Sequence, residues 1–189
     1  TTTCIQYDLD DLFERGFRTK NGSIRTPQSI QSYATLATII FQTNQNEQHG
    51  GQAIPAFDFF MAKGVRKTHL KHLQTLTDFY REVEGKEPNE DALKKIEEKA
   101  LAMTRKDTHQ AMEGFIHNLN TMHSRGGNQV VFSSINYGTD TSAEGRMVIE
   151  ELLKATIEGL GSRGEVPVFP IQIFKIKDLS LIHISEPTR

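Results

Sequence analysis

Cys4 is the residue with the most evident redox chemistry, and it stands in a short alternating segment near the start of the chain. Residues 4–9 alternate apolar and polar side chains, and this period of two predicts a β-strand. A lone thiol on a strand is most often a small buried hydrophobe. A catalytic role requires a strand end that faces a cavity and a second redox group, and the sequence contains no second cysteine. Spacing alone therefore leaves both interpretations of Cys4 open.

A second set of chemically useful side chains follows a short β-branched run in the last third of the chain. The composition of residues 130–136, which follow a glycine pair, predicts a buried strand. Ser133, Ser134 and Asn136 add hydroxyl and amide groups toward its carboxyl end, where ligands collect in parallel sheets and barrels. Capping of the next helix accounts for residues 139–141 but does not explain Ser133 and Ser134. We therefore expect these three polar side chains to bind a ligand.

The histidines and glycines complete no familiar cofactor motif. Seven histidines are present, and His69 and His72 lie three residues apart, which places them on one helix face. No carboxylate or thiolate completes a ligand set at a usual spacing, so we predict a solvated helix face and no metal site. The glycine pairs at 50–51 and 126–127 fit neither a Walker nor a dinucleotide-binding pattern. A single cysteine excludes an internal disulfide.

Charge and composition narrow the classes of function. The 189 residues carry 22 Lys and Arg against 24 Asp and Glu, a formal net charge of −2. That balance argues against sequence-independent binding to nucleic acid or to anionic lipid. No run approaches the roughly 20 apolar residues that span a bilayer, and no signal peptide opens the sequence. We expect a soluble, cytoplasmic α/β protein, either one domain or part of a larger one.

The elements that must position these residues follow from the spacing of the apolar side chains. The sequence predicts a turn or short hairpin around Gly16 and Gly22, followed by a helix with Thr26 as its N-cap. A capping box of Thr141 and Glu144 predicts the start of a later helix. The expected helices cover 27–46, 58–84, 88–123 and 141–160, and the expected strands cover 4–9, 130–136 and 167–176. The apolar stripe weakens at 105–108, which allows a break in the third helix.

The last strand, helix and strand form a βαβ unit, so the two strands should be parallel. Parallel strands covered by helices indicate a doubly wound sheet or an α/β barrel. Residues 178–189 do not continue this pattern and resemble a translated sequencing adapter. We expect this tail to be non-native, to pack poorly and to lie outside the folded unit of residues 1–177.

Five strings of residues stand out together. They are Thr2–Cys4, Asn46–Gln52, Asn118–Arg125, Phe132–Thr141 and Phe169–Phe174. In order and spacing they resemble the anaerobic (class III) ribonucleoside-triphosphate reductases, and they cover the chain up to about residue 177. Each string is weak by itself, but five in register are specific. The family's catalytic subunit is several times longer, so the resemblance makes this chain an internal portion of it.

The resemblance implies a fold and a reaction. The fold is a ten-stranded α/β barrel of the glycyl-radical type, of which this chain would be a helix-rich part. The reaction is the reduction of ribonucleoside triphosphates at the ribose 2′ carbon. In the family, a radical stored on a C-terminal glycine passes to a loop cysteine, whose thiyl radical removes the 3′ hydrogen of the ribose. Formate commonly supplies the electrons, and some members use a dithiol protein instead.

The resemblance also implies roles for the residues singled out above. Cys4 matches a second family cysteine, on a barrel strand, that helps the 2′ hydroxyl leave as water. A thiol suits that step because it is a better proton donor than water and its sulfur can share the oxidising equivalent. Ser133, Ser134 and Asn136 would border the same cavity and orient the sugar. The family's glycyl radical and structural zinc belong to parts of the subunit outside this chain, which itself is expected to hold no cofactor.

Partners and an alternative complete the hypothesis. The family implies ribonucleoside triphosphate substrates, ATP and deoxynucleotide effectors, a radical-SAM activating enzyme and a homodimer formed through helices. We expect the stripes at 30–41 and 70–76 to supply the dimer contact, and this portion alone to be inactive. The alternative is a non-catalytic helical dimerisation or regulatory module that binds nucleotide effectors, resting on the helices between Thr26 and His123. A parent sequence with a second cysteine and a radical segment would favour the enzyme.

Overall fold

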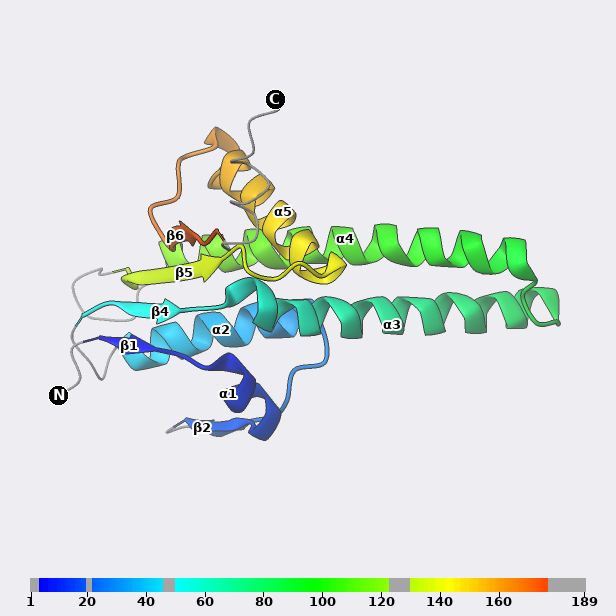
Figure 1. The fold of residues 1–189 in the computed structure, drawn as a ribbon, viewed down its shortest axis with the longest axis horizontal. Helices are drawn as coiled ribbons and strands as arrows, with labels where there is room; N and C mark the ends of the chain where they lie inside the picture. The colour runs from blue at the N-terminus through cyan, green and yellow to red at the C-terminus, as the bar shows by residue number, and fades with distance from the viewer. Residues whose placement is uncertain (1–3, 20–21, 46–49, 123–129, 177–189) are drawn as a thin grey trace, which may run out of the picture.

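The computed structural model describes residues 4–19, 22–45, 50–122 and 130–176 (Figure 1). Within them, four parallel strands form the main sheet, in the spatial order β1-β4-β5-β6. These strands are Ile5–Gln6, Gln52–Ile54, Ser133–Tyr137 and Ile171–Phe174. A separate antiparallel hairpin joins β2 (Phe17–Thr19) to β3 (Gly22–Ile24). The mixed α/β class, the parallel pairing of the last two strands and the early hairpin are therefore confirmed.

Helices connect the parallel strands, as parallel pairing requires. They are α1 (Leu9–Arg15), α2 (Ile30–Gln45), α3 (Phe57–Glu84), α4 (Glu90–Thr121) and α5 (Ala143–Glu158), followed by a 3-10 turn at Gly161–Arg163. Figure 1 shows α3 and α4 side by side as a long hairpin that extends well beyond the sheet. Gly85 ends α3 in the left-handed conformation, with φ of 64°, which glycine adopts without strain.

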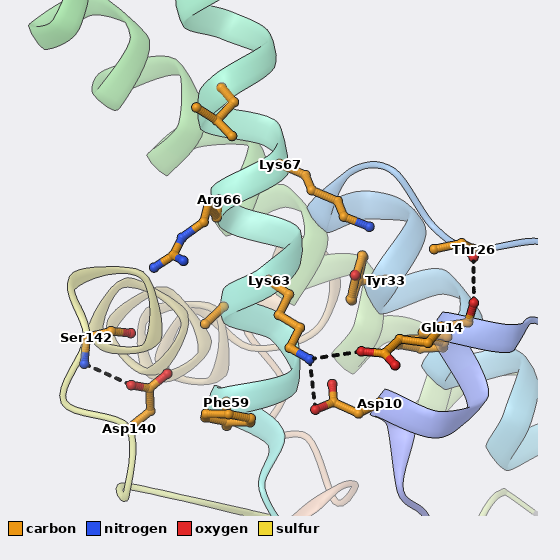
Figure 2. A pocket seen from close by; sticks show the side chains of 13 residues that line it. Asp10, Glu14, Thr26, Tyr33, Phe59, Lys63, Arg66, Lys67, Asp140 and Ser142 are labelled. Carbon is orange, nitrogen blue, oxygen red and sulfur yellow. Dashed lines mark hydrogen bonds and ion pairs between the residues drawn. The ribbon is translucent and has the colours of Figure 1, made fainter.

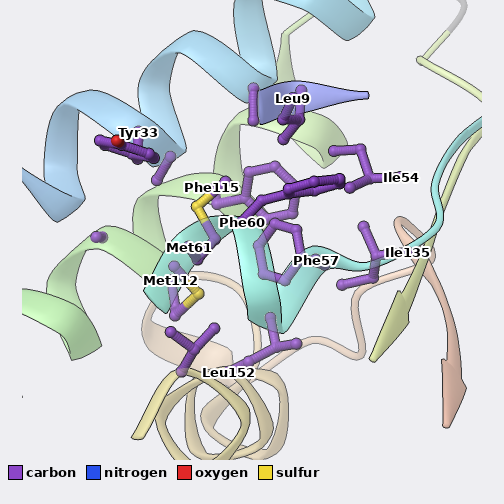
Figure 3. Packing of buried hydrophobic residues seen from close by; sticks show 14 of the residues in the cluster. Leu9, Tyr33, Ile54, Phe57, Phe60, Met61, Met112, Phe115, Ile135 and Leu152 are labelled. Atoms are coloured by element: carbon purple, nitrogen blue, oxygen red, sulfur yellow. The ribbon is translucent and has the colours of Figure 1, made fainter. Parts of the chain in front are cut away.

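The hydrophobic core lies between one face of the main sheet and helices α2 to α5 (Figure 3). Ile54 of β4 and Ile135 of β5 are fully buried in the same cluster as Phe57 and Phe115, whose ring centroids lie 5.0 Å apart. Burying one side chain of this size contributes about 1.5–3 kcal/mol. On the opposite face of the sheet, side chains such as Ile173 remain exposed. The described helices therefore cover one face only.

Two predicted helix starts are wrong, because other side chains cap these helices. Helix α2 begins at Ile30, where the Ser29 hydroxyl accepts from the Ser32 amide at 3.3 Å. Thr26 instead donates its hydroxyl to the Glu14 carbonyl. Helix α5 is capped by Ser142, which accepts from the Gly145 amide at 3.0 Å. The predicted capping box fails because the carboxylate of Glu144 binds Arg66 of α3 at 3.0 Å.

Helix α4 runs without the break that its weakened apolar stripe allows. The residue that interrupts the apolar stripe is Arg105, and its guanidinium lies 2.6 Å from Glu150 and 2.8 Å from Glu151 of α5. The expected solvated face of His69 and His72 is also wrong. Each ring contacts a carboxylate of α4 across the hairpin, Glu97 at 3.0 Å and Asp107 at 2.8 Å. Polar pairs therefore join the helices where the apolar pattern is interrupted.

Helix α1 and strand β4 are too short to show a clear period, and neither was predicted from the sequence. The strand expected over 4–9 is shorter, because the carboxylate of Asp8 accepts from the amides of Asp10 and Asp11 and starts α1. Strand β4 has only three residues, which are too few to show an alternating pattern of apolar and polar side chains. It nevertheless lies at the centre of the sheet, between β1 and β5.

Other expectations meet the structure in part or lie outside it. The stripe at 30–41 is buried in the core, so the prediction that it forms a dimer contact is wrong. The second stripe expected to supply the dimer contact, at 70–76, begins with Leu70 of α3, which is 58% exposed, and its role in a dimer stays a prediction. Residues 178–189 lie outside the described residues, and the hypothesis of a non-native tail stays a prediction. Among the helices that the structure describes, none is long and apolar enough to cross a membrane.

Candidate active-site face of the sheet

The face of the main sheet opposite the helices, called the open face here, carries three of the four residues predicted to act in chemistry. In the sheet register, Gln6, Ala53, Ser134 and Ile171 form one row across the four strands. Side chains alternate along a strand, so Asn136 lies on this face two residues beyond Ser134. Burial follows the same alternation, since Gln6 is exposed while Ile5 packs against the core.

Cys4 precedes β1 by one residue and is exposed on this same face. The backbone stays in the ladder there, because the Ile5 amide donates to the Gly51 carbonyl at 3.2 Å and the Gln52 amide donates to the Phe132 carbonyl at 3.1 Å. Cys4, Gly51 and Phe132 thus form the row two residues before the one that contains Ser134, which is the preceding row on the open face. The structure brings the thiol to the same side of the sheet as Ser134 and Asn136.

Ser133 is not part of this group. Its side chain is buried on the helix-covered face, and its hydroxyl donates to the Val131 carbonyl at 3.2 Å. It is also the first residue of β5, so Ser133 and Ser134 stand at the amino end of the strand rather than toward its carboxyl end as expected. The strand begins three residues later than the apolar run predicts, which shifts the position of both serines.

The polar groups of the open face differ in how far they are already satisfied. The Ser134 hydroxyl donates to the Gln52 carbonyl at 3.5 Å, which is a long and weak bond. The side-chain amide of Asn136 makes no hydrogen bond with any residue that the structure describes. Lys175, just after β6, extends over the sheet to donate to the Pro55 carbonyl at 2.8 Å. Among the described residues, the open face therefore offers a thiol, a hydroxyl, the side-chain amides of Gln6 and Asn136, and the cation of Lys175.

A buried glutamine on the other side of the sheet holds β4 in place. The side-chain oxygen of Gln52 accepts from the Tyr7 hydroxyl at 2.5 Å, and its amide nitrogen donates to the Phe41 carbonyl and to Gln45. Burial raises the pKa of Tyr7 above its usual value, so the phenol remains a proton donor. These bonds tie β4 and Tyr7, the residue after β1, to helix α2.

A buried carboxylate holds the loop that follows β5. Asp58, in the first turn of α3, is fully buried and accepts from the Gly138 and Asp140 amides at 2.8 and 3.0 Å. Gly138 has φ of 108°, and a side chain there would collide with the Lys175 carbonyl. Sequence analysis missed Gln52 and Asp58, although an isolated polar residue within an apolar stretch is the signal that marks both.

A separate pocket of about 470 Å³ lies between α1, α3 and the segment before α5 (Figure 2). Lys63, Arg66 and Lys67 of α3 line it, together with the rings of Tyr33 and Phe59. Their spacing of three and four residues puts the cations on one helix face. That spacing was legible in the sequence, and sequence analysis did not consider it.

The cations of this pocket have partners within the fold. Lys63 lies 2.9 Å from Asp10 and 3.7 Å from Glu14, and its hydrogen bond with Asp10 raises the pKa of the lysine. Lys67 donates to the Pro27 carbonyl at 2.9 Å and lies over the Tyr33 ring. An anionic ligand would therefore compete with carboxylates and a carbonyl for these cations.

The sequence was compared with known protein families. Residues 1–185 match the family model described as anaerobic ribonucleoside-triphosphate reductase. The chain belongs to this family. The matched residues include part of the segment 178–189, whose origin stays a prediction.

Known members of the family are considerably longer than this chain. The anaerobic ribonucleoside-triphosphate reductase of Enterobacteria phage T4 is 29% identical over 98% of the chain, which spans 29% of that protein. The corresponding proteins of Haemophilus influenzae and Escherichia coli are 29% and 27% identical over 92% and 93% of the chain, which spans 23% of each. The chain thus covers less than a third of these anaerobic reductases.

Proposed function

We propose that this chain forms part of the catalytic barrel of an anaerobic ribonucleoside-triphosphate reductase, which converts ribonucleoside triphosphates into deoxyribonucleoside triphosphates by radical chemistry. The observation that carries the proposal is the placement of Cys4, Ser134 and Asn136 on one uncovered face of a parallel sheet, in a member of this family. A sheet with helices on one side only is what a segment of a ten-stranded barrel presents, because its other side lines the barrel interior.

Cys4 is the proposed acid for loss of the 2′ hydroxyl. After a thiyl radical elsewhere in the subunit has taken the 3′ hydrogen, the Cys4 thiol gives its proton to the 2′ oxygen and the C–O bond breaks to release water. Overall, the ribonucleotide takes up two electrons and two protons and releases one water. Formate is the proposed reductant: it supplies both electrons and one proton and leaves as carbon dioxide, and the second proton is the one that passes through the Cys4 thiol. The thiol must come within about 3 Å of the leaving oxygen, and its exposure on the open face permits that approach.

The neighbouring polar groups orient the substrate in this proposal. The hydroxyl of Ser134 and the side-chain amide of Asn136 lie on the same face and offer hydrogen bonds to the sugar. Lys175 supplies positive charge near the carboxyl end of the strands, which suits the triphosphate. Ser133 has no place in this site, because its hydroxyl is buried on the opposite face.

Regulation and partners form the second part of the proposal. The pocket of Figure 2 combines three cations with two aromatic rings, a combination that suits a nucleotide effector such as ATP or a deoxynucleotide. The proposal further includes a homodimer, a radical-SAM activating enzyme and a cytoplasmic location. The pocket alone would equally serve a non-catalytic regulatory module, so the test must address chemistry.

The test is the variant Cys4→Ser in the complete reductase. We expect it to acquire the glycyl radical, seen by electron paramagnetic resonance, yet to form no deoxynucleotide, because a hydroxyl is a far weaker acid than a thiol. Ser162→Ala, in the exposed 3-10 turn, serves as the control and should retain normal turnover. Normal turnover by Cys4→Ser would show that the thiol is only a packing residue.

A further inference from the structure

The aromatic ring of Phe132 stands beside the thiol row of the open face. Phe132 precedes β5, is 52% exposed, and lies two strands from Cys4 in the same row. The residue between them in that row is Gly51 of the β4 segment, which has no side chain. Adjacent strands are about 4.8 Å apart, so nothing of β4 rises between the ring and the thiol.

The Phe132 ring leans over Gly51 and therefore toward β1. A Cβ atom placed on Gly51 would lie 3.3 Å from Cδ1 of Phe132 and 3.4 Å from Cε1, closer than side chains normally pack. The ring thus occupies the space that a side chain at this position would fill. Gly51 is needed here for close approach rather than for an unusual backbone conformation.

A second layer holds Phe132 from the other side. Phe169 packs edge-on against it, with ring centroids 5.3 Å apart. The backbone of Phe169 is fixed by Asn120 of α4, whose side-chain oxygen accepts from the Val168 and Phe169 amides at 2.9 and 3.0 Å. The amide nitrogen of Asn120 donates to the Phe169 carbonyl at 2.5 Å. One residue of α4 therefore fixes the backbone of the aromatic residue that packs against Phe132.

We infer that Phe132 is a positioning residue of the proposed active site. Its ring closes the β5–β6 side of the thiol row, so that a sugar at Cys4 is confined to the strip beside Ala53 and faces Ser134. The apolar ring also limits the approach of water to the thiol from that side. This inference rests on the proposed function for its role in catalysis, but the shielding of Cys4 by Phe132 can be tested without it.

The first experiment uses the thiol itself as the probe, because Cys4 is the single cysteine of the 189-residue chain. The rate of Cys4 alkylation by a bulky maleimide is measured for the unmodified chain, Phe132→Ala, Phe132→Leu and Gly51→Ala. We expect Phe132→Ala to raise the rate by roughly threefold or more, because access governs thiol reactivity along with ionisation. Phe132→Leu should restore most of the protection, and Gly51→Ala should raise the rate by displacing the ring.

Phe174→Ala is the matched control. Phe174 is also an exposed aromatic residue of this sheet, at 59%, but it packs against Tyr137 at the opposite end of the strands. Cys4 of the Phe174→Ala variant should be alkylated at the rate found for the unmodified chain. Circular dichroism should show the same helix content for every variant. If Phe132→Ala is folded and its Cys4 reacts at the original rate, the inference is wrong.

The second experiment moves Phe132→Ala and Phe132→Leu into the complete reductase. We expect kcat/KM to fall by roughly 10- to 100-fold in the alanine variant, since small displacements of a bound sugar are costly, and to recover in the leucine variant. Faster alkylation with unchanged kcat/KM would overturn the positioning role. Failure of the proposed function would look different, because Cys4→Ser would then turn over normally whatever Phe132 does.

Discussion

On the helix-covered face of the main sheet, Gln52, Ile54 and Ile135 are buried and each polar atom of Gln52 is bonded. On the open face, Gln6 and Phe132 remain exposed, and the side-chain amide of Asn136 has no partner among the described residues. The same strands thus have one face whose side chains are buried and hydrogen-bonded and one face whose side chains are exposed. Substitutions on the first should cost stability, whereas substitutions on the second should cost function and little stability.

The largest contrast should come from two phenylalanines. Phe57→Ala removes a fully buried ring that packs on Phe115, and it should lower the free energy of unfolding by about 3–5 kcal/mol. Phe132→Ala on the open face should cost only about 1 kcal/mol, mainly for its contact with Phe169. Urea unfolding followed by circular dichroism measures both. Equal losses would mean that the open face is part of the core.

A second contrast uses two glutamines in adjacent positions of the sheet. Gln52→Leu removes the buried acceptor of the Tyr7 hydroxyl and the buried donor to the Gln45 side chain, and it should cost about 2–3 kcal/mol. Gln6→Leu changes an exposed residue and should stay within about 0.5 kcal/mol. The same unfolding assay separates them, and a neutral Gln52→Leu would show that the buried network is dispensable.

How much of this was predictable from the sequence depends on the length of each pattern. The long helices α3 and α4 were predicted to within a few residues, because their apolar stripes repeat over many turns. Strand β4 was missed because three residues cannot show a period, although it lies between Cys4 and Ser134. The alternation of side chains already implies that Ser133 and Ser134 point to opposite faces. Which of the two is buried could not be predicted, since it depends on how β5 pairs with its neighbours, and a shift of one residue reverses the two faces.

That separation supplies a smaller contrast between two neighbouring serines. Ser133→Ala removes a buried hydroxyl that donates to the Val131 carbonyl, and it should cost about 1 kcal/mol. Ser134→Ala removes a hydroxyl with only a 3.5 Å contact, and it should change stability by less than about 0.5 kcal/mol. In the complete reductase the order should reverse, with Ser134→Ala raising KM and Ser133→Ala leaving it unchanged.

The smallest effect is expected from pH, at the ion pairs that Glu150 of helix α5 forms with Arg105 of helix α4 and with Lys154. Hydrogen bonds from Arg105 and then Lys154 lower the pKa of Glu150 from 4.5 to about 2. A carboxylate whose pKa is lower in the folded state stabilises the fold above the unfolded value of 4.5, and this stabilisation is lost as the pH falls toward 2. Because half of this side chain is exposed, we expect less than about 1 kcal/mol.

Stability is measured by urea unfolding between pH 2 and pH 7. Glu150→Gln should lower stability at pH 7 and flatten the fall below pH 4.5, and added salt should reduce the difference. Glu113→Gln, at an exposed position of α4, is the control and should leave the profile unchanged. An identical pH profile for Glu150→Gln would show that the ion pairs with Arg105 and Lys154 contribute nothing.

The hairpin of α3 and α4 lies between two strands that pair directly, since Ile54 and Ile135 are partners in the ladder. Contacts within the hairpin join neighbouring parts of the chain, whereas the ladder between β4 and β5 forms only after the ends of this long insertion meet. Local contacts form fastest during folding. Closing a long loop costs conformational entropy before the contacts between its ends can stabilise the chain. The hairpin should therefore fold early and bring its two ends together, so that the sheet, and with it the surface around Cys4, is completed late.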